Sequence, residues 1–169
     1  EQHTEEYEQS FSSDTSLFML QRIEYGCEGK AYESRKLNEH RFETEGCKTM
    51  SVLTKTILDG VDYESIVQKR RENFSFAKHL FDSINCIVAD KHCDSDTVPM
   101  VYPLLIEDDE ALVRLKEAKH FQGHWWEYLQ EEMPEDSAEY WISRYIIPIT
   151  IDQRYGKKEL DYLQHIISK

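Results

Sequence analysis

His120 and His124 are four residues apart, a spacing that places two imidazoles on one face of a helix and is typical of metal-binding histidines. The zinc-protease pattern also needs a glutamate directly after the first histidine, and Phe121 stands there. Gly123, between the two histidines, disfavours a continuous helix. The sequence contains no G-x-G-x-x-G, no phosphate-binding P-loop and no G-x-S-x-G nucleophile elbow. Residue types and spacing alone therefore identify no catalytic residue.

The four cysteines have irregular spacing, at Cys27, Cys47, Cys86 and Cys93. A disulfide scaffold is normally smaller and denser in cysteine, so the spacing favours reduced thiols in a cytosolic protein. A zinc site would combine Cys86, His92 and Cys93, with His120 and His124 as further ligands. That spacing matches no zinc ribbon or finger. We interpret the segment as a solvated loop and predict no metal site.

The composition limits the classes of partner. A chain of 169 residues with 40% hydrophobic residues can bury a core, and a net charge of −13 repels phosphate backbones and anionic lipid. We therefore expect neither a nucleic-acid nor a membrane partner. No apolar run approaches the roughly 20 residues of a membrane span. The acidic start shows no signal peptide and no initiating Met, so we expect a cytoplasmic protein of which this chain is a fragment.

The stretch 146–155, I-I-P-I-T-I-D-Q-R-Y, is the clearest structural signal. Its alternation predicts a strand with Ile147, Ile149 and Ile151 on one face. Pro148 cannot donate to a sheet ladder, which indicates an edge strand or an irregular strand end. A turn over 152–156 and a helix to about Ile167 follow.

Helical spacing predicts further helices over about 13–23, 30–45, 62–84 and 111–118, and strands are predicted over 98–106 and at H-W-W-E-Y, 124–128. Cys86 to Ala89 is a possible short strand. The expected fold class is α+β: a small, mostly antiparallel sheet covered by helices, with an N-terminal helical segment.

Three stretches carry a resemblance to a known family. They are R-R-E-N-F at 70–74, the strand–helix–turn from Val98 to Gly123 that leads into His124-Trp125, and I-P-I-T-I-D-Q-R-Y with its helix. In order and spacing they resemble the small C-terminal domain of the DegT/StrS-like aminotransferases, pyridoxal-phosphate (PLP) enzymes of fold type I. The resemblance covers about 59–169 and implies that 1–58 is a helical connecting segment.

The resemblance implies an enzyme that transfers an amino group to a keto-sugar or related carbonyl substrate. It also implies PLP in the full-length protein, a large N-terminal domain in the same polypeptide and a homodimer. The family's Schiff-base lysine belongs to that large domain, so we expect no cofactor in this chain and no catalysis by it alone. The alternative is a non-catalytic interaction module that retains the small-domain fold.

The resemblance also implies candidates for a substrate cleft, namely His124, Trp125, Arg154 and Tyr155. The tryptophans have an alternative role in packing, and Asp152 to Arg154 have one in fixing the turn through side-chain bonds to the backbone. Trp126 stands where many relatives have a proline. Arg70 and Arg71, with Asn73, could reach an anionic group, but helix-surface ion pairs are the simpler expectation for the arginines.

Overall fold

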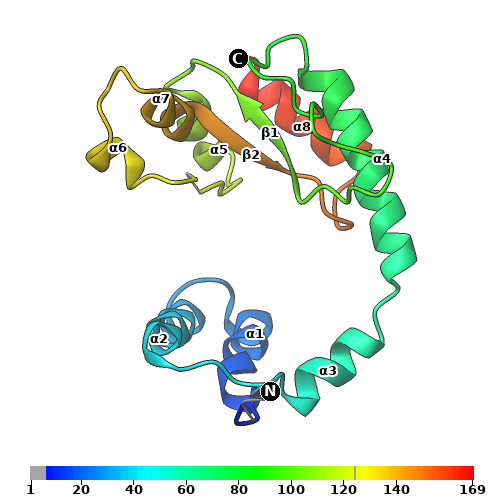
Figure 1. The fold of residues 1–169 in the computed structure, drawn as a ribbon, viewed down its shortest axis with the longest axis vertical. Coiled ribbons are helices and arrows are strands. Elements are labelled where there is room, and N and C mark those ends of the chain that lie inside the picture. The colour runs from blue at the N-terminus through cyan, green and yellow to red at the C-terminus, as the bar shows by residue number, and fades with distance from the viewer. Residues whose placement is uncertain (1–6, 124) are drawn as a thin grey trace, which may run out of the picture. The chain divides into compact units, whose positions relative to one another are not determined.

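The computed structural model describes residues 7–123 and 125–169, and the chain divides into two compact units between Val61 and Asp62 (Figure 1). Unit 1 comprises the residues up to Val61, and unit 2 those from Asp62 to the end. The division lies three residues beyond the boundary expected from the sequence. Each unit is described by itself.

Unit 1 is helical, with α1 (Ser13–Tyr25), α2 (Lys30–Thr44) and α3 (Val52–Asp59). The first two helices pack against each other. The Ser51 hydroxyl caps α3 by accepting a hydrogen bond from the Thr54 backbone N–H at 3.0 Å. The sequence predicts α1 and α2, but it shows no clear helical pattern over the eight residues of α3.

Unit 1 has very little interior. Among its described residues, 7–61, the buried side chains are Gln21, Ala31 and Ser51, and none of these is a large apolar group. Phe11 and Ile23 are each 83% exposed. Such side chains lose the roughly 1.5–3 kcal/mol each that burial would contribute, so this unit gains little stability from packing of its own.

Unit 2 is α+β, as predicted, and holds seven elements in its described residues: α4 (Tyr63–Phe81), β1 (Val101–Leu105), α5 (Ala111–Glu117), α6 (Leu129–Glu132), α7 (Ala138–Tyr145), β2 (Ile146–Thr150) and α8 (Lys157–Ile167). Asp62 caps α4, because its carboxylate accepts from the Ser65 N–H.

The predicted strand at 124–128 is wrong for its described residues. Trp126 has a φ of +57°, which is incompatible with extended backbone, and its carbonyl accepts from the Leu129 N–H to form a turn into α6. The segment from Cys86 to Ala89 is also not a strand, although the Cys86 N–H donates to the Leu105 carbonyl at 2.8 Å.

β1 and β2 form an antiparallel pair in which Pro103 faces Pro148. Residues directly opposite each other in such a pair alternate between positions that exchange hydrogen bonds and positions that do not. Two facing prolines fit the second kind, because neither has an N–H to donate. Each strand of a two-stranded sheet is an edge strand, which agrees with the expectation for Pro148.

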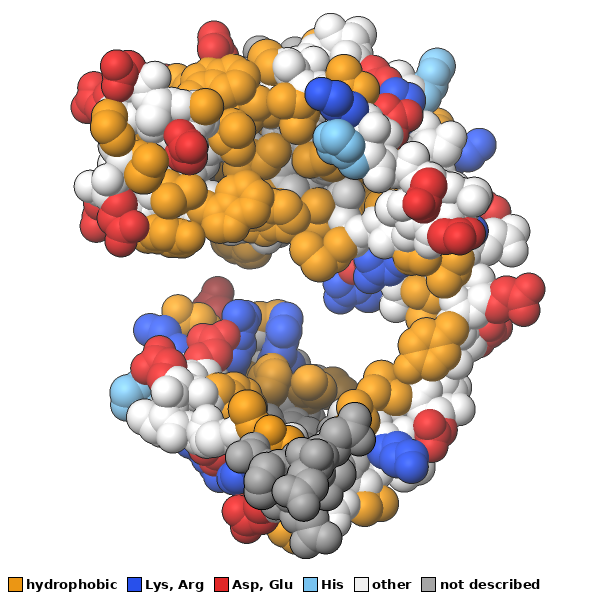
Figure 2. Space-filling model, in the orientation of Figure 1, with side chains coloured by type: hydrophobic (Ala, Val, Ile, Leu, Met, Phe, Trp, Pro, Cys, Tyr) orange, Lys and Arg blue, Asp and Glu red, His pale blue; other side chains and the backbone are white. Residues whose placement is uncertain are grey.

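The core of unit 2 lies where the sheet meets α4, α5 and α8 (Figure 1). As predicted, Ile147, Ile149 and Ile151 are buried, and Pro148 is buried too. Leu160 and Leu163 of α8 complete the same cluster. Figure 2 shows that hydrophobic side chains also gather on the visible surface of unit 2, and that charged groups rim them.

Candidate functional site

Asn73 on α4 joins the R-R-E-N-F segment to the turn after β2. Its buried side-chain Nδ2 lies 3.1 Å from the Ile151 carbonyl, 3.0 Å from that of Asp152 and 2.9 Å from that of Tyr155. Buried carbonyls need such partners, because an unsatisfied one costs about 1–3 kcal/mol. One amide therefore fixes a turn about eighty residues further along the chain.

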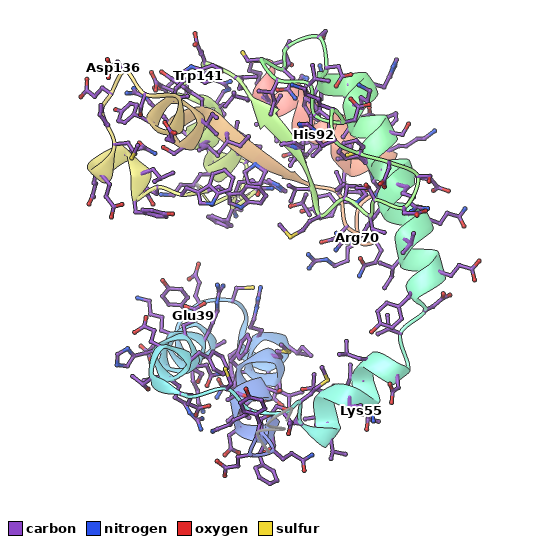
Figure 3. All side chains as sticks on the ribbon, viewed as in Figure 1. Glu39, Lys55, Arg70, His92, Asp136 and Trp141 are labelled. Atoms are coloured by element: carbon purple, nitrogen blue, oxygen red, sulfur yellow. The ribbon has the colours of Figure 1, made fainter. Side chains whose placement is uncertain are left out.

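Arg70 and Arg71 hold the segment before β1. Arg70, labelled in Figure 3, donates to the Pro99 and Met100 carbonyls at 3.2 and 3.1 Å. Arg71 donates to the Thr97 carbonyl at 3.1 Å. The expected ion pairs on the helix surface are thus replaced by bonds to backbone. The reason is tertiary: the strand entry lies alongside α4 and offers carbonyls that the sequence alone does not reveal.

The turn after β2 is built by Asp152. Its carboxylate accepts from the Arg154 backbone N–H at 2.9 Å, as expected, and pairs with the Arg154 guanidinium at 2.6 Å. Hydrogen bonding from Arg154 lowers the pKa of Asp152 against the effect of burial, and it raises the pKa of Arg154. The Arg154 side chain is 76% exposed, so its head group is accessible to solvent from the rim of the turn.

The end of α5 determines where the next loop starts. The His120 N–H donates to the Leu115 carbonyl at 2.8 Å, and the Lys119 N–H donates to the Lys116 carbonyl at 2.9 Å. This is the Schellman arrangement, which requires a left-handed residue after the helix cap. Lys119 occupies that position with a φ of +59°, where glycine is usual.

His120 forms a polar cluster with one residue of its own loop, one at the end of β2 and one in the turn after β2. Gln122 Nε2 lies 3.0 Å from His120 Nε2 and 3.0 Å from Thr150 Oγ1. The His120 ring meets the Tyr155 ring edge-on, with centroids 6.1 Å apart. We call these four residues the His120 cluster.

Burial shifts the acid–base properties of the His120 cluster. Desolvation lowers the pKa of His120, which favours the neutral ring. Burial also raises the pKa of Tyr155, to which the Asp152 charge adds, while a side-chain hydrogen bond with Thr150 acts in the opposite direction. Near neutral pH the cluster therefore presents a neutral imidazole and a neutral phenol.

Trp125 and Trp126 follow the cluster in the chain. Their rings lie 5.4 Å apart between centroids at an angle of 60°, and Trp126 is 47% exposed. Together they present an aromatic surface of the kind that packs against a flat or apolar group. His124, the fourth cleft candidate, lies outside the described residues.

The structure thus brings one predicted site residue, Tyr155, into a polar cluster. Arg154 pairs with Asp152 instead, and Trp125 packs at a tilt against Trp126. Sequence reasoning missed Gln122 and Thr150. A polar Thr150 between two buried isoleucines was the available signal, because it marks the face of the strand that a polar group must meet.

The lysines of this chain do not fit a Schiff base to PLP. Such a lysine must be desolvated to lose its proton near neutral pH, and all twelve lysines are exposed or only partly buried. Hydrogen bonds to Asp82 and Asp90 raise the pKa of Lys78, the opposite of what that chemistry needs.

Metal ligands are not gathered in the described part of the chain either: residues 7–123 and 125–169 contain no group of three or more His, Cys, Asp or Glu placed to hold an ion. Cys86 and Cys93 are both exposed. Among the helices of the same residues, none is long and apolar enough to cross a membrane.

No protein family, curated protein or solved structure matches this chain.

Proposed function

We propose that unit 2 is the small domain of a PLP-dependent, DegT/StrS-like aminotransferase, and that unit 1 connects it to a large domain. Asn73 carries the proposal. Two of the three stretches behind the resemblance, R-R-E-N-F and I-D-Q-R-Y, are bonded to each other through this one amide. If the two stretches are needed together to hold one fold, they would be expected to occur together in every protein with that fold.

The third stretch supports the proposal through its place in the fold. Its loop meets the turn of the I-D-Q-R-Y segment at the His120 cluster, through the contacts of Gln122 with Thr150 and of His120 with Tyr155. Neutral imidazole and phenol groups, followed a few residues along the chain by a tryptophan pair, suit a polar but uncharged substrate surface, such as that of a sugar. In the proposed enzyme this surface forms one wall of the cleft, and the reacting groups come from the large domain.

The apolar side chains exposed in unit 1 favour the view that this unit packs against another folded domain or protein. Leu37 and Val52 are 69% and 68% exposed, and Phe11 and Ile23 of the same unit are exposed to a still greater extent. An open hollow of about 820 Å³ lies among α1, α2 and the start of α3, where Phe18, Phe42 and Met50 line it. In the proposed enzyme, the large domain and the second subunit of a homodimer would cover these groups.

An interaction module without catalysis is the second candidate. The exposed apolar side chains of unit 1 fit it equally well, because a partner protein could cover them. The two candidates differ in what the parent protein does with the cofactor.

A half-reaction assay separates them. The protein encoded by the whole reading frame is purified, mixed with PLP and a panel of amino acids, and followed by cofactor absorbance. A donor-dependent change in the parent protein, absent from the 169-residue chain under the same conditions, is the expected result. If the full-length protein takes up no PLP, the aminotransferase proposal fails and the non-catalytic interaction module becomes the favoured function.

A further inference from the structure

A single glutamine connects the loop after α5 to the sheet. The Gln122 amide has two N–H groups, and its nitrogen lies 3.0 Å from both His120 Nε2 and Thr150 Oγ1. Since Gln122 donates, Nε2 is the acceptor and the proton of the neutral ring lies on Nδ1. We call the bridge formed by His120, Gln122 and Thr150 the Gln122 latch.

Left-handed residues stand on both sides of the latch. Lys119 has a φ of +59° and Trp126 a φ of +57°, and each such position costs a non-glycine residue about 1–2 kcal/mol. A tryptophan there is an outlier because of its bulk. Conformations of this kind persist where surrounding contacts hold them, and Gln122 supplies such a contact between the two.

We infer that Gln122 is a positioning residue: through His120 and Thr150 it holds residues 119–123 against the end of β2 and thereby sets the orientation of the Trp125–Trp126 pair. Loss of the latch frees the loop to relax out of its left-handed ends. The meaning of that orientation for a substrate cleft rests on the proposed function, whereas the latch itself does not.

The chemistry of the latch gives it a distinctive response to substitution. Gln122→Ala removes both hydrogen bonds of the bridge. Thr150→Val removes only the one to β2 and nearly preserves the side-chain shape. Gln122→Glu reverses the roles instead, because a carboxylate accepts from the Thr150 hydroxyl and from a protonated His120. A negative neighbour favours the imidazolium, so this variant raises the pKa of His120 from its lowered value.

The test is solution NMR on the 169-residue chain. In the chain without substitutions, the backbone amides of Phe121 and Gly123 are expected to show order parameters near 0.85. In the Gln122→Ala and Thr150→Val variants, the order parameters of the same two amides fall below about 0.6. The indole N–H signals of Trp125 and Trp126 move together in these variants. The Trp141 indole, bonded to Glu107 at 2.7 Å, stays in place as an internal reference.

Gln164→Ala is the matched control, because among the described residues its side chain bonds only Ser168, the C-cap of α8, and its loss leaves the loop unchanged. Gln122→Glu keeps the tryptophan signals in their original positions and raises the pKa of His120, which an inert packing role would not do. The inference is overturned if Gln122→Ala and Thr150→Val both leave the loop rigid, or if Gln122→Glu leaves the titration of His120 unchanged. None of these readouts depends on PLP, so the proposed function can fail while the latch stands.

Discussion

Burial of His120 ties the stability of unit 2 to pH just below neutrality. The pKa of His120 is lowered in the folded protein, so the unfolded chain binds more protons as pH falls through the ordinary histidine value of 6.5. The free energy of unfolding should therefore decrease as pH falls from about 7 through the lowered pKa, with a slope of at most about 1.4 kcal/mol per pH unit, the limit for one proton.

Urea unfolding at a series of pH values measures this slope. The elements around His120 carry the following titratable or charged groups: Lys116, Glu117, Lys119, Asp152, Arg154, Tyr155 and Glu159. The pKa of Asp152 is lowered, so its contribution is lost in a separate, more acidic window. A His120→Asn variant should lose the slope near neutrality and keep the acidic one. An unchanged slope near neutrality would remove His120 as its source.

Asn73 is the residue whose loss should be most costly to the fold. Asn73→Ala removes the amide donor from the carbonyls of Ile151, Asp152 and Tyr155, of which Asp152 keeps the Tyr155 N–H, and we expect the free energy of unfolding to fall by about 3 kcal/mol. Gln68→Ala is the control on the same helix, because within the described part of the chain its amide bonds only the exposed Glu72; a change within about 0.5 kcal/mol is expected. Equal effects would mean that the contacts of Asn73 are not structural.

At the scale of elements, the end of α5 carries a removable strain. Lys119→Gly places the preferred residue in the left-handed position of the Schellman turn and should stabilise the protein by about 1 kcal/mol, measured as a shift in the urea midpoint. Lys116→Gly, in the last turn of the same helix, should destabilise it by about 1 kcal/mol. Loss of stability in both variants would show that Lys119 makes a contact worth more than its strain.

The elements that the sequence predicts well are those with strong local patterns. The alternation at 146–151 and the helical spacing from Asp62 onward predict β2 and α4. The elements that it misses depend on distant partners. A left-handed Trp126 replaces a strand by a turn, and His120 acquires its role from Thr150, thirty residues away. The same limit explains Arg70, whose carbonyl partners belong to the segment before β1.

For the whole molecule, stability should be uneven between the two units. Unit 2 buries a cluster that includes Phe81, Tyr102 and Leu163, whereas the described part of unit 1 buries no large apolar side chain. Hydrogen exchange on the 169-residue chain should find amides of α1 and α2 at least about a hundredfold less protected than those of α8 and the two strands. Equal protection would indicate that unit 1 is stabilised by contacts beyond those within it.

Under the proposed function, this chain would contribute to a PLP site only together with a large domain. Its Asn73 bridge, two-stranded sheet and His120 cluster provide a framework and one wall, but the chain offers no lysine suited to an internal aldimine. The net charge of −13 adds no attraction for an anionic phosphate ester.

The most direct test is borohydride reduction of the complete parent protein in the presence of PLP, followed by peptide mapping of the modified lysine. We predict a single reduced cofactor–lysine adduct on a lysine outside residues 1–169, and none on the isolated chain beyond random surface labelling. A specific adduct on a lysine between 62 and 169, or a parent protein that forms no adduct at all, would contradict the assignment of unit 2 as an aminotransferase small domain.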